Sequence, residues 1–96
     1  MTQTPKLSDI EVQRELGHLT GWMRKGESLV KTFTFPTFPA GIAFVDRVAA
    51  AAQAMDHHPD MDIRFTRISA TLSTHSSGGI TASDIALAKE MDRLAE

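Results

Sequence analysis

The chain has 96 residues, of which 42% are apolar and 23% are charged, and its net charge is −2. A chain of this size builds one hydrophobic core, so we expect a single domain over residues 1–96. The near-neutral charge balance gives no electrostatic footprint for nucleic acid or for a membrane surface. The sequence has no cysteine, which excludes disulfides, a thiolate nucleophile and every cysteine-based metal site.

The start of the chain lacks a targeting pattern. No apolar run follows a basic region after Met1, and no apolar run anywhere approaches the roughly 18 residues of a membrane span. We therefore expect a cytoplasmic protein without a membrane partner.

Capping signals and apolar periodicity predict three helices. The first begins at about Ser8, which has the capping-box spacing with Glu11. The second and longest follows Pro36 and runs from about Phe38 to His57. The third is capped by the segment Thr81-Ala82-Ser83-Asp84. The apolar stripe of the first helix is Val12, Leu16 and Leu19, and that of the third is Leu87, Met91 and Leu94. The stripe of the second helix is Ile42, Val45, Ala49 and Ala52, and it is widened by Phe44, Val48 and Met55.

Alternating polarity predicts four strands, which are 20–25, 28–35, 61–66 and 67–75. Gly26-Glu27 is the turn between the first two, and Lys31 interrupts the apolar side of the second. After Pro59 the alternation changes phase, which indicates either a tight turn near Thr66-Arg67 or a bulge. We favour the turn, between two short antiparallel strands. The order α-β-β-α-β-β-α favours an α+β fold, with a four-stranded antiparallel sheet and three helices packed on one face.

Three of the four histidines, His57, His58 and His75, lie close together in the sequence, and Pro59 ends the helix beside the first two. Such imidazoles can be surface residues, metal ligands together with a carboxylate, or an acid and base near neutral pH. Adjacent histidines point in different directions, and the chain has no His-x-x-x-His spacing, which disfavours a metal. His18, at the end of the first helix, is expected to be a structural or surface residue.

A wider set of residues falls at the spacing of a known signature: Gln53, His57-His58-Pro59, Phe65, His75 and Asp84. Through these residues the chain resembles the pterin-4a-carbinolamine dehydratase family. The resemblance extends over nearly the whole length and also includes Gly21-Trp22, Phe33-x-Phe35, Thr71-Leu72-Ser73-Thr74-His75 and Gly79-Ile80-Thr81. The resemblance implies a four-stranded antiparallel sheet with three helices on one side, assembled as a homodimer or homotetramer. It also implies loss of water from a 4a-hydroxytetrahydropterin, with no metal and no cofactor, in tetrahydropterin recycling.

The same resemblance implies roles for individual residues. His57 and His75 match the histidines that protonate the leaving hydroxyl, and His58 matches the one that positions the substrate or takes the N5 proton. The residues that it places against the pterin are Asp56, His57 and His58; Ser73, Thr74 and His75; and Gln53, Met61 and Asp84. Capping of the last helix alone is an alternative explanation for Asp84.

Two residues depart from the family pattern. Gln53 stands where most members have glutamate, and Met61 stands where many have tryptophan. Both changes bear on substrate affinity more than on reaction type. The alternative function is a pterin-binding or protein-dimerisation module, similar to a transcriptional coactivator, without significant turnover.

Overall fold

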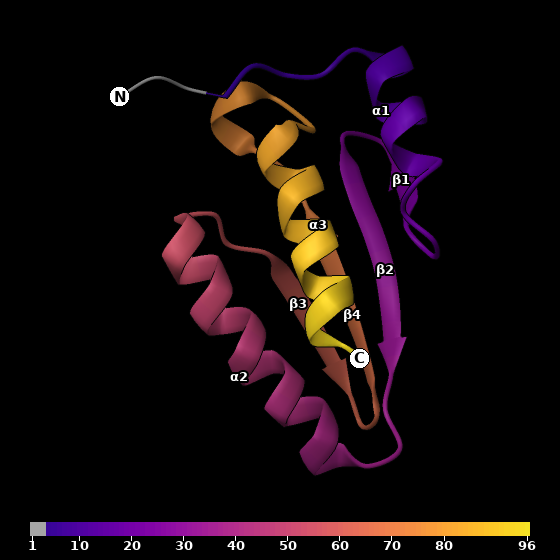
Figure 1. Cartoon of the computed structure of the whole chain (residues 1–96), viewed down its shortest axis with the longest axis vertical. Coiled ribbons are helices and arrows are strands. Elements are labelled where there is room, and N and C mark those ends of the chain that lie inside the picture. The colour runs from indigo at the N-terminus through magenta and orange to yellow at the C-terminus, as the bar shows by residue number, and fades with distance from the viewer. Residues whose placement is uncertain (1–3) are drawn as a thin grey trace.

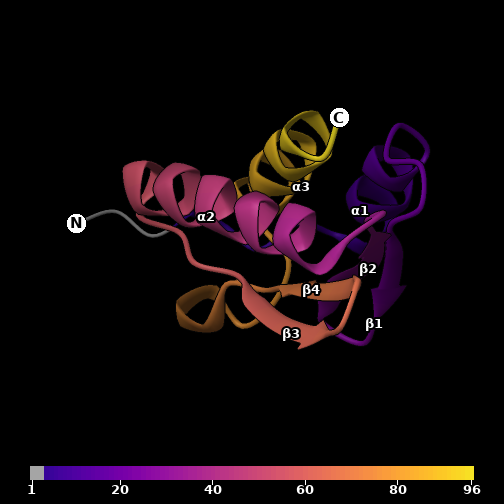
Figure 2. The same cartoon turned by 90° about the horizontal axis from the view of Figure 1, so that it is seen from below.

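The computed structural model describes residues 4–96, and within them the fold has the predicted order α-β-β-α-β-β-α. The elements are α1 (Asp9–Leu16), β1 (Met23–Lys25), β2 (Ser28–Thr34), α2 (Phe38–Met55), β3 (Asp60–Arg64), β4 (Arg67–Leu72) and α3 (Ala82–Leu94), with a 3₁₀ turn at His75–Ser77 before α3. The strands form one antiparallel sheet in the order β1-β2-β4-β3. All three helices cover the same face of this sheet (Figure 1 and Figure 2). The predicted α+β class is therefore confirmed.

The core lies between the helices and the two central strands, β2 and β4. In the antiparallel register Leu29 lies opposite Leu72, and Phe33 lies opposite Ile68. Paired residues of an antiparallel sheet share a face, and these four side chains are all buried. Their alternation with polar residues sets which face of the sheet receives the helices.

The buried side of α2 is rotated from the predicted stripe. Its buried residues are Gly41, Phe44, Val48 and Ala52, whereas Ala49 is exposed and Met55 is 36% exposed. A Cβ on Gly41 would lie 3.1 Å from Cδ1 of Ile68, so glycine lets the helix approach the sheet closely. Among residues 4–96, no helix is both long enough and apolar enough to cross a membrane.

Lys31, which interrupts the apolar side of β2, lies on the helix-facing side opposite Ala70. Its Nζ donates to Oδ1 of Asp92 at 2.8 Å and to the carbonyl of Thr20 at 3.0 Å. The ammonium also lies 4.8 Å from the centre of the Phe33 ring. A lysine is tolerated here because its stem covers apolar surface while its charge is paired with α3.

Four predicted boundaries were wrong, each for a local reason. The first strand begins at Met23, because Gly21 has a φ of +86° and ends the preceding turn. The turn between β3 and β4 is centred one residue earlier than predicted, at Phe65-Thr66, with Phe65 in the left-handed region. The last strand ends at Leu72 instead of residue 75, since the chain turns into the 3₁₀ segment. Helix α2 ends at Met55 instead of His57, because Asp56 is in the left-handed region.

Replacement of Phe44 by alanine should strongly destabilise this core. The Phe44 ring is fully buried, and its centre lies 4.9 Å from the ring centres of both Phe33 and Phe35. Loss of the ring should lower the free energy of unfolding by about 3–5 kcal/mol, measured by urea denaturation. Phe65→Ala is the control, since that ring is 74% exposed and should change stability by about 0.5 kcal/mol or less. Equal effects of the two substitutions would contradict this placement of the core.

Candidate active site

His57 and His58 lie in the short connection between α2 and β3. The helix ends at Met55, two residues earlier than predicted, because Asp56 adopts a left-handed conformation with a φ of 52°. The amide of Asp56 donates to the carbonyl of Gln53, and the amide of His57 donates to the carbonyl of Ala52. These two bonds form a Schellman motif, which ends a helix sharply. The connection therefore holds both histidines outside the helix.

The ring of His57 is held by a buried carboxylate. Its Nε2 lies 2.6 Å from Oδ1 of Asp84, which belongs to the first turn of α3. The side chain of Asp84 is 0% exposed and that of His57 is 15% exposed. Within residues 4–96, Nδ1 of His57 has no hydrogen-bond partner, and no buried side-chain nitrogen or oxygen is left without one. We conclude that Nδ1 reaches solvent.

The second oxygen of Asp84 binds two further groups. Oδ2 accepts from the hydroxyl of Thr74 at 2.8 Å and from the backbone N–H of Thr81 at 2.9 Å. The second of these bonds is half of the capping box that starts α3, as predicted. A buried carboxylate needs several donors to offset its desolvation, and Asp84 has three partners. One side chain therefore ties together the connection after α2, the loop after β4 and the start of α3.

His58 has a different partner. Its Nε2 lies 2.9 Å from Oε1 of Gln53, five residues earlier in the last turn of α2. Pro59 disfavours the helical region for His58, so the chain turns away and the ring lies back over the helix end. Both residues are exposed. His58 therefore has an uncharged partner in Gln53.

His75 begins the 3₁₀ turn and is exposed. The neighbouring Thr74 is fixed by its hydroxyl bond to Asp84 and by a backbone bridge to Gly79. Within residues 4–96 no hydrogen bond joins the His75 ring to the other two rings. Asp84 thus contacts both the His57 ring and the hydroxyl of Thr74, the residue before His75. The backbone of His75 is positioned relative to His57 by this pair of contacts.

The loop that carries His75 is also held from the β1–β2 turn. The hydroxyl of Ser73 donates to the carbonyl of Glu27 at 2.8 Å. The Glu27 carboxylate pairs with Lys6 at 2.7 Å and with Arg24 at 3.1 Å. The hydrogen bond from Lys6 is the largest cause that holds the pKa of Glu27 below its usual value. Glu27 was not predicted as part of this region, because no local sequence pattern places a hairpin turn beside a loop 46 residues later.

Four other predicted site residues also have defined places. Met61 is half-buried and packs against the core from β3, opposite Ala70. Asp56 is exposed at the helix end. The hydroxyls of Ser73 and Thr74 are bonded within the chain, so they hold the loop in this structure. His18 is exposed in the turn after α1 and takes no part in these contacts.

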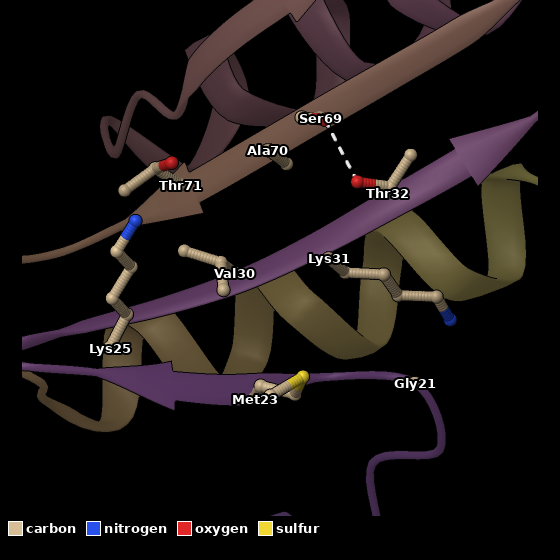
Figure 3. A pocket seen from close by; sticks show the side chains of 9 residues that line it. All are labelled: Gly21, Met23, Lys25, Val30, Lys31, Thr32, Ser69, Ala70 and Thr71. Atoms are coloured by element: carbon tan, nitrogen blue, oxygen red, sulfur yellow. Dashed lines mark hydrogen bonds between the residues drawn. The ribbon is translucent and has the colours of Figure 1, made fainter.

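A hollow of about 480 Å³ lies elsewhere, on the face of the sheet that the helices leave open (Figure 3). Met23, Val30 and Thr71 point into it from three strands, and Lys25 lies at one end. No histidine lines it. A dehydration needs groups that exchange protons near neutral pH, so we place the candidate active site at the histidines and treat this hollow as separate.

The histidines do not form a metal cluster in the described part of the chain. Among residues 4–96, no three histidine, aspartate or glutamate side chains are grouped so that they could hold an ion. The Nε2 atoms of His57 and His58 are instead directed to Asp84 and Gln53.

Comparison with known proteins places the whole arrangement in context. Residues 5–94 match the model of a family described as pterin 4 alpha carbinolamine dehydratase. A relative from Roseiflexus sp. (strain RS-1), named after this dehydratase, is 48% identical over 93% of this chain and 96% of its own length. One from Nocardia farcinica (strain IFM 10152), named in the same way, is 49% identical over 96% of this chain and 97% of its own length.

Two solved structures share the fold. A protein from Brucella melitensis, described as a transcriptional coactivator/pterin dehydratase, has a TM-score of 0.92 and 32% identity, covering 95% of this chain and 99% of that one. A pterin dehydratase-like protein, described as a RuBisCO assembly factor in the alpha-carboxysome, has a TM-score of 0.69 and 28% identity, covering 81% of this chain and 93% of that one.

Replacement of Asp84 by asparagine should destabilise the protein. Asparagine has one acceptor oxygen and a donating amide, so it cannot accept from all three partners of the carboxylate. We expect the free energy of unfolding to fall by about 3 kcal/mol in urea denaturation. Asp62→Asn makes the same change on the exposed side of β3, where the side chain is 59% exposed, and should cost about 0.5 kcal/mol or less. An Asp84 variant as stable as this control would refute the buried hydrogen-bond hub.

Proposed function

The chain belongs to the pterin-4a-carbinolamine dehydratase family, and on that premise we propose that it removes water from a 4a-hydroxytetrahydropterin to give the quinonoid dihydropterin. One observation carries the proposal most strongly. The His57 ring is held through Nε2 by a buried carboxylate, while its Nδ1 reaches solvent. This geometry suits a positioned acid at the edge of a binding site.

The reaction needs two proton transfers, one to the hydroxyl oxygen on C4a and one from N5. The bond between C4a and the hydroxyl oxygen breaks, and a proton delivered to that oxygen makes the leaving group water. The N5–H bond also breaks, and its electrons form the C4a=N5 double bond. A positioned acid and a positioned base each typically contribute about 10²–10⁴-fold to such a step. Two or three oriented imidazoles therefore suffice as the reacting groups of the protein.

His57 is the stronger candidate for the acid. With Asp84 ionised, the carboxylate accepts the proton of Nε2, so the tautomer and the ring plane are set by the fold. The accessible Nδ1 then faces whatever occupies the site. We assign His75 to the same oxygen, because the bond from Thr74 to Asp84 fixes the adjacent backbone relative to the His57 ring.

The remaining residues contribute to binding and position. Because Asp84 is fully buried and its oxygens are already bonded, we assign it a positioning role behind His57 instead of direct contact with the substrate. The backbone of Ser73 and Thr74 remains close to His75 and suits the polar edge of a pterin. Asp56 and Met61 flank the two adjacent histidines along the chain and complete the proposed binding surface.

A binding role is the second candidate. The hollow on the open face of the sheet has apolar Met23 and Val30 beside hydroxyl-bearing residues, and it is separate from the histidines (Figure 3). Two proteins of this fold are described as a coactivator and as an assembly factor. Pterin binding without turnover in the wild-type protein would favour this second function.

We also propose a cytoplasmic homodimer or homotetramer, because β1 and β3 leave sheet edges open for a symmetric partner.

Treatment with a chelator should leave the dehydration rate unchanged. The proposed acid and base are imidazoles whose Nε2 atoms are bonded to Asp84 and Gln53, so they need no ion to orient them. The measurement compares turnover before and after dialysis against EDTA, with added Zn²⁺ as a further arm. Loss of turnover that Zn²⁺ restores would overturn the metal-free mechanism.

Substitution of the proposed acids tests the assignment of residues. His57→Ala and His75→Ala should each lower kcat by about 10²–10⁴-fold, since each removes a group that donates to the leaving oxygen. The double variant should lose less than the product of the two single effects, because both residues act on one atom. His18→Ala is the matched control and should keep wild-type kcat. Wild-type turnover in both single variants, with circular dichroism unchanged, would exclude histidine catalysis at this site.

A further inference from the structure

We propose that Gln53 is a positioning residue that holds neutral His58 with its proton on Nε2, which makes Nδ1 of His58 the acceptor of the substrate's N5 proton. The inference rests on the proposed function for the acceptor role. The contact between Gln53 and His58 can be tested without any substrate.

The first step is the geometry of the helix end. Asp56 in the left-handed conformation closes α2, and Pro59 keeps the next residues extended. The His58 ring thereby returns to the last turn, where its Nε2 lies 2.9 Å from Oε1 of Gln53. Gln53 projects from a regular helix, so its backbone is fixed on one side of the contact. A helical residue positions a ring more precisely than a loop residue does.

The second step is the inventory of donors and acceptors. A neutral imidazole has one N–H donor and one acceptor nitrogen, and a carbonyl oxygen only accepts. If the carbonyl of Gln53 faces Nε2, that nitrogen carries the proton and Nδ1 keeps a free lone pair. The bond thus selects the tautomer that a proton acceptor needs.

The third step is the contrast between the adjacent rings. Asp84 places a buried negative charge beside His57, whereas Gln53 places only an amide dipole beside His58. Different environments for two titratable groups are how a site separates its acid from its base. We therefore assign proton donation to His57 and proton acceptance to His58.

This division balances the reaction. His57 gives its Nδ1 proton to the 4a oxygen, the C4a–O bond breaks and water leaves. His58 takes the N5 proton on Nδ1, and the electrons of the N5–H bond form C4a=N5. The protein ends with one proton moved from His57 to His58, and exchange with solvent restores the starting state. No oxidant or further reactant is needed.

The test measures the tautomer of His58 in the ligand-free protein by long-range ¹H–¹⁵N NMR. We compare the wild type with Gln53→Glu, which keeps an acceptor oxygen but has no donor, and with Gln53→Met, which keeps the length but has neither. We expect the Nε2–H tautomer in the wild type and in the glutamate variant. The methionine variant should show a second tautomer, with kcat lower by about 2- to 10-fold and a smaller change in KM, as expected for one lost hydrogen bond.

The control is Gln13→Met, the same substitution on the exposed surface of α1, which should change neither the tautomer nor kcat. An Nδ1–H tautomer in the wild type, or an unchanged kcat in Gln53→Met, would overturn the inference. The two proposals fail differently. Absence of dehydration by the wild type defeats the proposed function and the acceptor role with it, whereas the NMR comparison still decides whether Gln53 sets the tautomer.

Discussion

The buried carboxylate of Asp84 is the constraint on which the rest of the site depends. A charge removed from water is costly unless several donors replace its hydration, and here three groups do so from three separate segments. The carboxylate also lies at the positive end of the α3 dipole, which favours a negative charge. Each of the three segments is therefore held in place by a hydrogen bond to this carboxylate.

Local backbone features deliver the partners to this carboxylate. The left-handed Asp56 ends α2 and aims His57 towards α3, while the bridge between Thr74 and Gly79 folds the loop after β4 over the same point. Both loops are tied to the first turn of α3, because each contributes a hydrogen bond to Asp84. Side chains on these loops are in this way held by contacts with a helix.

The sheet separates two kinds of surface. One face is covered by the helices and forms the core (Figure 1 and Figure 2). His57 and His58 lie where α2 passes into β3, and His75 lies in the 3₁₀ turn after β4. The opposite face is polar except for side chains such as Met23 and Val30. No histidine lines the hollow on this open face. A shared fold can in this way accompany different roles in different proteins.

The features that the sequence determined by itself are those that depend on residues three or four positions apart. The capping boxes of α1 and α3, the hairpin turn at Gly26-Glu27 and the presence of four strands all follow from such local rules. The pattern that resembles the family predicted His57, His58, His75 and Asp84 as site residues, and the structure joins two of them, His57 and Asp84, by a hydrogen bond.

Other features were decided only by tertiary structure. The buried face of α2 is the one that carries Phe44, because the Phe44 ring packs against the rings of Phe33 and Phe35. Lys31 is tolerated on the core side of β2, because its ammonium pairs with Asp92 of α3. His57 meets Asp84 across 27 positions of sequence, and Ser73 meets Glu27 across 46. No short-range pattern encodes such contacts, since their geometry exists only after the helices have packed on the sheet and buried charges have found donors.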